Sequence, residues 1–310
     1  VVNDKKNQGI SEKTWKNVKK IGKKYNYIGN NKIRRLNKRK FIFFMEEFSY
    51  NENVASKLLD GFNDYDLKSH QFVFLFNKLL DNKKNIFKAI EEFKPDGIII
   101  AYSYTKKIEV NLNNLKLSKI LLNCYSNNFN GLTILPDDYN GAKKAVNYLF
   151  QNNLKKIPII LSSDTWMKGY KDRLSGWRDA HAENNINYKD SFIVQPKSNL
   201  ENGGYLEAKK LFKKNKKIDA IFCTSDEIAM GSYQAIKEAG LKIPNDISVI
   251  GFDNSRISEL VKPKLTTVQL PYSEMTQKAI KHIIDPQKFN DNFNILVESP
   301  LIKRESVKVK

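Results

Sequence analysis

From Phe41 onward the chain alternates strand-length apolar runs with amphipathic stretches of helical spacing. Apolar runs such as 97–101 predict buried strands, and recurrence of apolar positions every three or four residues predicts helices. The pattern predicts strands at 41–45, 71–76, 97–101, 119–123, 157–161, 191–194, 220–223 and 249–252, and helices at 54–62, 83–93, 139–151, 173–184, 204–213 and 226–239. Strands that alternate with helices favour parallel sheets covered by helices on both faces. Two such sets predict an α/β protein with two similar lobes and a cleft between them.

The first forty residues have another pattern, a basic amphipathic helix followed by a short charged segment. Ser11 is placed as a helix N-cap, and Ile10 and Trp15 have the spacing of a hydrophobic staple. Apolar residues then recur at helical spacing while lysines fill the other faces, and we expect the helix to end near Tyr25. The segment 27–36 is too short and too charged to form a stable helix alone.

Composition and charge separate these forty residues from the rest of the chain. The 310 residues are enough for two domains, and no apolar run reaches the ~18 residues of a membrane span. Of the net charge of +19, residues 1–40 contribute +12, with 14 Lys or Arg against two acids. Such a segment attracts phosphate backbones. The alternative is that the whole chain is basic only because its composition is rich in Lys and Asn. Such a composition explains the +7 of residues 41–310 better than the +12 of residues 1–40.

Cysteine and histidine usage gives no indication of a metal site or a disulfide framework. Cys124 and Cys223 each lie in or beside an apolar segment and are expected to be small buried hydrophobic residues. His70, His181 and His282 lie far apart without ligand spacing. We therefore expect no metal and no cofactor, and a cytoplasmic, reducing environment.

The N-terminal segments resemble the headpiece of the LacI/GalR transcription regulators, which has a valine-serine-glutamate helix start and a tyrosine-x-proline-asparagine turn. Here the corresponding stretches are 10–12 (Ile-Ser-Glu) and 27–30 (Tyr-Ile-Gly-Asn), followed by a segment that ends at Leu36. Gly29 in place of proline and Ile33 in place of a small residue depart from the family pattern. Residues 1–3 resemble the end of a recognition helix, so we expect about twenty preceding residues to be missing.

This resemblance implies how the segment meets DNA. Residues 30–36 would fold into a hinge helix when two copies meet in the minor groove, with Leu36 as the wedge that kinks the duplex. Tyr27, Asn30 and Arg34 would be further DNA-binding residues. Leu36 as an ordinary linker residue is the alternative. Residues 1–40 are thus identified as the remnant of a small α-helical headpiece with its hinge.

The rest of the chain resembles the same family in a series of blocks that occur in family order. These blocks are 137–142, 173–177, 219–231, 240–253, 263–268 and 301–306; residues 41–135 match only in rhythm, apart from 95–100. The resemblance implies that residues 41–310 form a two-lobed, periplasmic-binding-protein-like core that binds an effector and dimerises. The expected N-subdomain comprises about 41–137 and 269–285, and the expected C-subdomain about 138–268 and 286–310.

Two charged residues are the leading candidates for an effector site. Arg173 and Asp253 fall at strand ends, where open α/β sheets bind ligands, and by resemblance they grip the effector. A fork of donors with a paired acceptor suits hydroxyl-rich ligands such as sugars. The alternatives are a surface salt bridge for Arg173 and a turn residue for Asp253. Ser225 is expected to line the pocket, with Asp226 as an N-cap; stacking residues from the first lobe are predicted at Tyr50 and Tyr104.

Together these features predict a ligand-responsive homodimer that binds double-stranded operator DNA, acts as a repressor, senses a sugar or similar small molecule and does not enter a membrane. The alternative is a sugar-binding receptor of a membrane transporter with the same two-lobed fold, against which the basic N-terminal segment argues. We expect no enzymatic activity, because no nucleophile–base pair, metal set or phosphate loop is evident and Arg173 and Asp253 have the character of binding residues.

Overall fold

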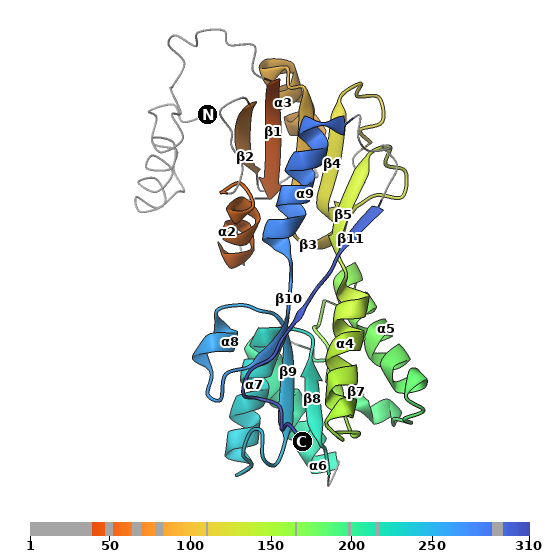
Figure 1. Ribbon diagram of the computed structural model, residues 1–310, viewed down its shortest axis with the longest axis vertical. Helices are drawn as coiled ribbons and strands as arrows, with labels where there is room; N and C mark the ends of the chain where they lie inside the picture. The colour runs from red at the N-terminus through yellow and green to blue at the C-terminus, as the bar shows by residue number, and fades with distance from the viewer. Residues whose placement is uncertain are drawn as a thin grey trace.

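The computed structural model describes residues 39–46, 52–63, 70–77, 83–109, 111–164, 166–197, 200–214, 217–286 and 294–310. These residues form two lobes that follow one another along the long axis of the molecule (Figure 1). Each lobe is built on a six-stranded sheet, as the alternation of strands and helices predicts. The predicted headpiece helix, the DNA-binding candidates Tyr27, Asn30, Arg34 and Leu36, and Tyr50 all lie outside the described residues.

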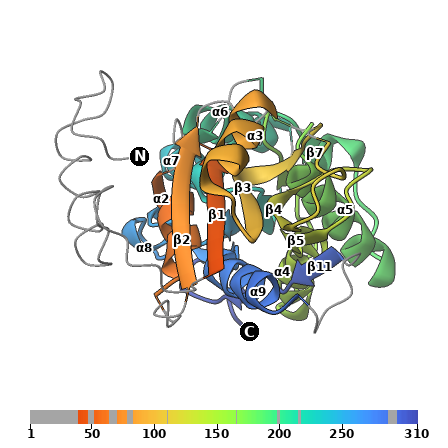
Figure 2. The same ribbon diagram turned by 90° about the horizontal axis from the view of Figure 1, so that it is seen from above.

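The N-lobe sheet has the order β11-β5-β4-β3-β1-β2, and its strand pairs are parallel. Its strands are β1 (Arg39–Glu46), β2 (His70–Asn77), β3 (Gly97–Lys107), β4 (Ser118–Tyr125), β5 (Leu132–Pro136) and β11 (Asn294–Val297). Helices α2 (Glu52–Asp60) and α9 (Tyr272–Ile284) pack on one face, and α3 (Lys83–Phe93) covers the other (Figure 2). In β1, Phe41 and Phe43 pack toward α2 and α9, whereas Ile42 and Phe44 pack toward α3. Continuous apolar runs therefore fit a strand that is buried on both faces.

The C-lobe sheet has the order β12-β10-β9-β8-β6-β7, with only the short β12 antiparallel to its neighbour in the described part. Its strands are β6 (Ile159–Ile160), β7 (Ile193–Val194), β8 (Ala220–Cys223), β9 (Ser248–Asp253), β10 (Thr266–Gln269) and β12 (Leu301–Ile302). One face carries α4 (Asp138–Gln151) and α5 (Lys168–Glu183), and the other carries α6 (Leu200–Lys214) and α7 (Asp226–Glu238). The short elements η2 (Asp190–Phe192) and α8 (Ile257–Leu260) lie in connections.

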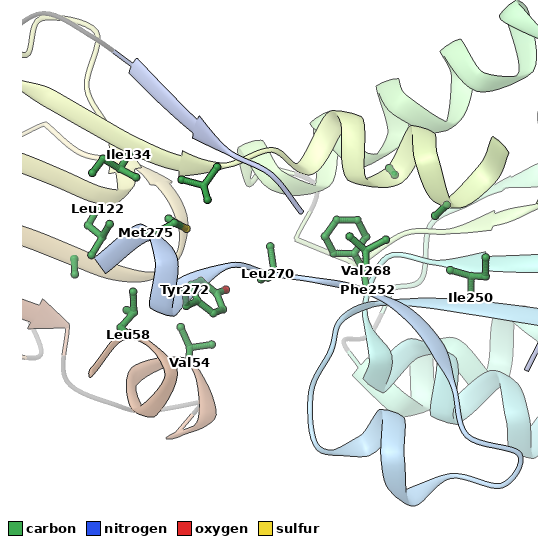
Figure 3. Close-up of a cluster of buried hydrophobic side chains, with 14 of the residues drawn as sticks. Val54, Leu58, Leu122, Ile134, Ile250, Phe252, Val268, Leu270, Tyr272 and Met275 are labelled. Atoms are coloured by element: carbon green, nitrogen blue, oxygen red, sulfur yellow. The ribbon is translucent and has the colours of Figure 1, made fainter. Parts of the chain in front are cut away.

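The chain passes between the lobes three times: from β5 into α4, from β10 into α9 and from β11 into β12. Backbone hydrogen bonds tie these crossings together, from Asp137 N to Val297 O and from Gln269 N to Pro300 O, both 2.8 Å. Figure 3 shows Leu270 between Val268 of the C-lobe and Tyr272 at the start of α9. Buried apolar side chains continue through this junction from one lobe to the other.

The structure corrects the predicted boundary at the end of the chain. The C-subdomain was expected to take all of 286–310, but β11 pairs with β5 in the N-lobe sheet, and only the residues after it belong to the C-lobe. The pairing of β11 is a long-range contact, which a local hydrophobic pattern does not reveal. The predicted strands at 157–161 and 191–194 are shorter than expected, β3 is longer, and β5 and α9 were not predicted.

Other expectations from composition can be compared with the described residues. Cys124 and Cys223 are both buried, which confirms them as small core residues. No helix within the described ranges combines the length and apolar character that crossing a membrane requires.

Candidate functional site

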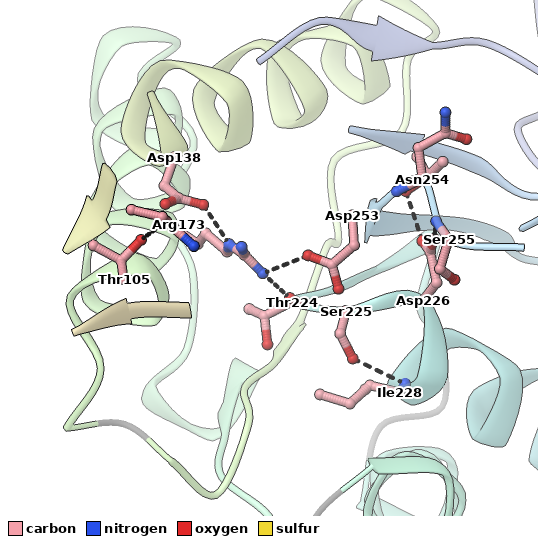
Figure 4. Close-up of polar contacts among 12 residues, drawn as sticks. Thr105, Asp138, Arg173, Thr224, Ser225, Asp226, Ile228, Asp253, Asn254 and Ser255 are labelled. Atoms are coloured by element: carbon pink, nitrogen blue, oxygen red, sulfur yellow. Dashed lines mark hydrogen bonds and ion pairs between the residues drawn. The ribbon is translucent and has the colours of Figure 1, made fainter. Parts of the chain in front are cut away.

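Arg173 is the centre of a buried polar cluster at the C-lobe side of the junction between the lobes. Its side chain lies on α5 and is only 7% exposed. The Nε atom donates to Asp138 Oδ1 at 2.8 Å, and Nη1 donates to the carbonyl oxygen of Thr224 and lies 3.3 Å from Asp253 Oδ1 (Figure 4). The guanidinium also lies over the ring of Phe252, 3.8 Å from its centroid. Burial excludes the surface salt bridge considered for Arg173.

Local helix-capping geometry explains how Asp138 comes to face Arg173. The chain enters α4 directly from the lobe crossing, and Asp137 is the N-cap, its carboxylate accepting from Asn140 N at 3.0 Å. Asp138, at the first helical position, is therefore free to turn inward, where it is 2% exposed. Gly169 of α5 packs against the same carboxylate, and a Cβ added at Gly169 would lie 3.1 Å from Asp138 Oδ2. The sequence predictions did not include Asp138, although two adjacent acids at a helix start indicate that one of them is not needed as a cap.

Asp253 brings the second carboxylate to Arg173 from the carboxyl end of β9. Its φ angle of 104° is outside the range that residues with a side chain readily adopt, and Asn254 follows with φ of 48°. Asp253 is thus both the turn residue that the sequence allowed and a partner of Arg173. The structure brings together the two leading candidates of the sequence prediction.

Burial dominates the electrostatics of these groups. Desolvation raises the pKa of Asp138 and of Asp253 above the ordinary aspartate range, while the charge of Arg173 opposes the shift in both cases. Burial alone would lower the pKa of Arg173, but the carboxylates of Asp138 and Asp253 outweigh it and raise that pKa, so the guanidinium stays charged. Burial also raises the pKa of the adjacent Tyr170 to about 12, which keeps its hydroxyl protonated.

The N-cap role that the sequence suggested for Asp226 belongs to Ser225. Ser225 is the N-cap of α7, and its hydroxyl accepts from Ile228 N at 3.3 Å, so the prediction of Asp226 as the N-cap is wrong. Asp226 is instead the first helical residue and fully buried, and it accepts from Thr267 Oγ1 and from Ser255 N, each at 2.6 Å. Burial raises its pKa to about 7. Asp226 thereby fixes the turn that follows Asp253, while a ligand contact by Ser225 stays a prediction.

Tyr104 reaches the junction from the N-lobe. It lies on β3, half-buried, and its ring meets that of Trp166 edge to face with centroids 5.9 Å apart. Trp166 precedes α5 in the C-lobe and is 55% exposed. The sequence predictions missed Trp166, which lies in a connection without a periodic pattern.

The arrangement is suited to binding through polar contacts between two lobes. Among the described residues, Nη2 of Arg173 has no hydrogen-bond partner, which leaves two N–H donors for a bound molecule. Asp253 supplies an acceptor beside them, and Tyr104 with Trp166 supplies aromatic surface. The described part of the chain holds no group of three or more His, Cys, Asp and Glu that could bind a metal ion.

Comparisons with known proteins agree with this architecture. Residues 146–307 match the model of the periplasmic binding protein-like domain family. The chain is 28% identical to the HTH-type transcriptional regulator MalR of Clostridium butyricum, across 96% of this chain and 91% of that protein.

Solved structures of regulators have the same fold. A LacI family transcriptional regulator from Enterococcus faecium with bound ribose superposes with a TM-score of 0.66 at 24% identity, covering 86% of this chain and 98% of that one. The lac repressor dimer bound to operator and the anti-inducer ONPF has a TM-score of 0.70 at 17% identity, covering 97% of this chain and 99% of that one. The chain therefore belongs to the LacI family of transcriptional regulators, whose core is a periplasmic binding protein-like domain.

Proposed function

We propose that this protein is a repressor that responds to a small hydroxyl-rich molecule, a sugar or a sugar derivative, bound between its lobes. The observation that carries the proposal is the pairing of the buried Arg173 with the partly buried Asp253, with the Nη2 donors of Arg173 left for a ligand. Planar donors beside a carboxylate recognise vicinal hydroxyl groups well. A ligand held by the C-lobe pair and by Tyr104 of the N-lobe would favour one arrangement of the lobes over others.

The second part of the proposal is that the effector controls binding to operator DNA by a homodimer. Residues 1–40 carry a net charge of +12, which supports an electrostatic contact with phosphates. The relative on operator DNA is a dimer. In this proposal Tyr27, Asn30, Arg34 and Leu36 are the DNA-binding residues, and two copies present them to the two halves of an operator.

A receptor for a membrane transporter is the competing function on the same fold. The basic N-terminal segment and the helix-turn-helix regulator among the relatives both favour the DNA-binding proposal. Enzymatic activity forms no part of the proposal.

Differential scanning fluorimetry tests the effector site. Ribose, galactose, cellobiose and adenosine are added to the wild type and to Asp253→Asn, with Lys144→Met, which breaks an exposed pair with Glu298, as the control. A ligand at 100 times its Kd adds about 2.7 kcal/mol, which raises the Tm by roughly 5 °C. We expect Asp253→Asn to lose most of this shift and Lys144→Met to keep it. An equal shift in Asp253→Asn would reject the site.

Fluorescence anisotropy with a labelled duplex tests the second part. At low salt the chain should bind DNA, and its affinity should fall steeply as salt is added, because phosphate contacts release counterions. A variant without residues 1–38, which keeps β1 whole, should not bind. Indifference of the full chain to duplex DNA at low salt, with and without the four ligands, would refute the proposed regulator.

A further inference from the structure

One lysine joins the N-lobe directly to the segment that carries Asp253. Lys57 lies on α2, and its Nζ donates to the backbone carbonyl oxygen of Asn254 at 2.7 Å, across 197 positions of sequence. Asn254 is the residue directly after Asp253, in the turn that leaves β9 of the C-lobe. The bond therefore connects two lobes and ends one residue away from the candidate ligand carboxylate.

The turn that receives this bond is held firmly to the C-lobe. Asn254 Oδ1 accepts from Arg304 Nη2 at 2.8 Å, and Asn254 Nδ2 donates to Gln269 Oε1 at 3.0 Å. Ser255 N donates to Asp226 Oδ2 at 2.6 Å. With positive φ angles at both Asp253 and Asn254, the turn has one defined shape that these bonds stabilise. A change of its shape at one end is therefore transmitted to the carbonyl that Lys57 contacts.

The surroundings of Lys57 support a specific role for its ammonium group. The side chain is half-buried beside a pocket of about 690 Å³ at the lobe junction, which Asn254 and Gln269 also line. Desolvation by burial lowers the pKa of Lys57, and the negative charges of Asp253, Asp226 and Asp60 oppose that shift. Two of these three carboxylates belong to the opposite lobe.

We propose that Lys57 is a positioning residue that couples Asp253 to the angle between the lobes. The Lys57–Asn254 bond and the Tyr104–Trp166 contact both join the N-lobe to the C-lobe in this arrangement. Loss of the bond therefore favours arrangements in which the lobes separate and the two rings part. The role in regulation rests on the proposed function, in which Asp253 contacts the effector, whereas the mechanical coupling does not.

Trp166 provides a measurement of lobe separation that requires no ligand. In a Trp15→Phe background, Trp177 is fully buried, so acrylamide quenching reports on Trp166. Loss of a half-exposed hydrogen bond from a charged donor should shift the equilibrium between joined and separated lobes by about fivefold. We expect Lys57→Met to raise the Stern–Volmer constant of Trp166, and Lys57→Arg, which keeps a donor, to restore much of the wild-type value.

Two comparisons separate coupling from a loss of charge or stability. Lys278→Met removes the same charge from the same pocket, but Lys278 pairs with Glu274 of its own helix, so quenching should not change. In the Asp253→Asn background, Lys57→Met should have a smaller effect than in the wild type, because both residues act through one turn. Equal quenching in Lys57→Met and Lys278→Met, or additive effects of Lys57→Met and Asp253→Asn, would overturn the proposal whether or not an effector binds.

Discussion

Replacement of Arg173 by methionine should destabilise the fold in a way that depends on pH. The guanidinium is buried between the carboxylates of Asp138 and Asp253 and donates to the carbonyl oxygen of Thr224. Methionine fills much of the same volume but supplies neither charge nor donors. The buried carboxylate of Asp138 and the partly buried carboxylate of Asp253 are then left without a cation, and the Thr224 carbonyl loses a hydrogen bond.

The magnitude follows from the cost of breaking a buried pair by removing one partner, about 3–5 kcal/mol in the free energy of unfolding at neutral pH. Burial already raises the pKa of Asp138 and Asp253, with Arg173 opposing the shift, so the variant raises both pKa values further. The folded variant then holds protons that the unfolded chain releases above about pH 4, and folding becomes less favourable as pH rises toward neutrality. The loss caused by Arg173→Met should therefore be smaller at pH 5 than at pH 7.5.

Urea denaturation followed by circular dichroism at both pH values measures this difference. Lys144→Met, which breaks the exposed pair with Glu298, is the control and should change stability by less than about 1 kcal/mol at either pH. A loss below about 1 kcal/mol for Arg173→Met at pH 7.5, or an equal loss at both pH values, would show that the cluster does not have the electrostatics described.

Two further predictions concern the core of the C-lobe. Burial lowers the pKa of His181, so the unfolded state takes up more protons at this residue below about pH 6.5, and the wild type should lose stability relative to His181→Phe from pH 7 to pH 5. Urea titrations of both proteins measure this difference, and a His282→Gln control that shows the same difference from the wild type would contradict the assignment. Gly204→Ala should lower the free energy of unfolding by about 3 kcal/mol, because the added Cβ would lie 2.2 Å from Ile228 O. Gly240→Ala, which has open space around it and a φ of 72°, should lower it by only about 1 kcal/mol. Equal losses of stability in thermal unfolding would refute the close contact between the helices.

The sequence predicted the fold best where the apolar pattern of a short segment is enough to identify its buried residues. Strand β8 and helix α3 have the predicted bounds, because each has a strong apolar pattern between clear breaks. Helix α9 was missed although Tyr272, Met275, Ala279 and Ile283 lie at helical spacing and are buried. The pairing of β11 with the N-lobe depends on a crossing between lobes, and no local pattern encodes which sheet a short edge strand joins.

The candidate site was predicted in part, and helix capping accounts for the rest. Arg173 and Asp253 were both identified, and they lie together. At the starts of α4 and α7 the N-cap is the first of two polar residues, Asp137 in one case and Ser225 in the other. The following aspartates are then buried in the polar network. Sequence alone does not decide which of two adjacent capping residues takes the cap, because both choices satisfy the free amides of the first turn.

The strained backbone at Asp253 connects the candidate ligand site with the lobe junction. A φ of 104° in a residue with a side chain costs about 1–3 kcal/mol and persists only where neighbouring contacts outweigh it. Those contacts come from Asp226, Arg304 and Gln269 in the C-lobe or its crossing, and from Lys57 in the N-lobe. The conformation that points the carboxylate at Arg173 is thus maintained partly by the opposite lobe. In the proposed mechanism, a ligand that binds Asp253 would therefore act on the lobe angle through a turn already under strain.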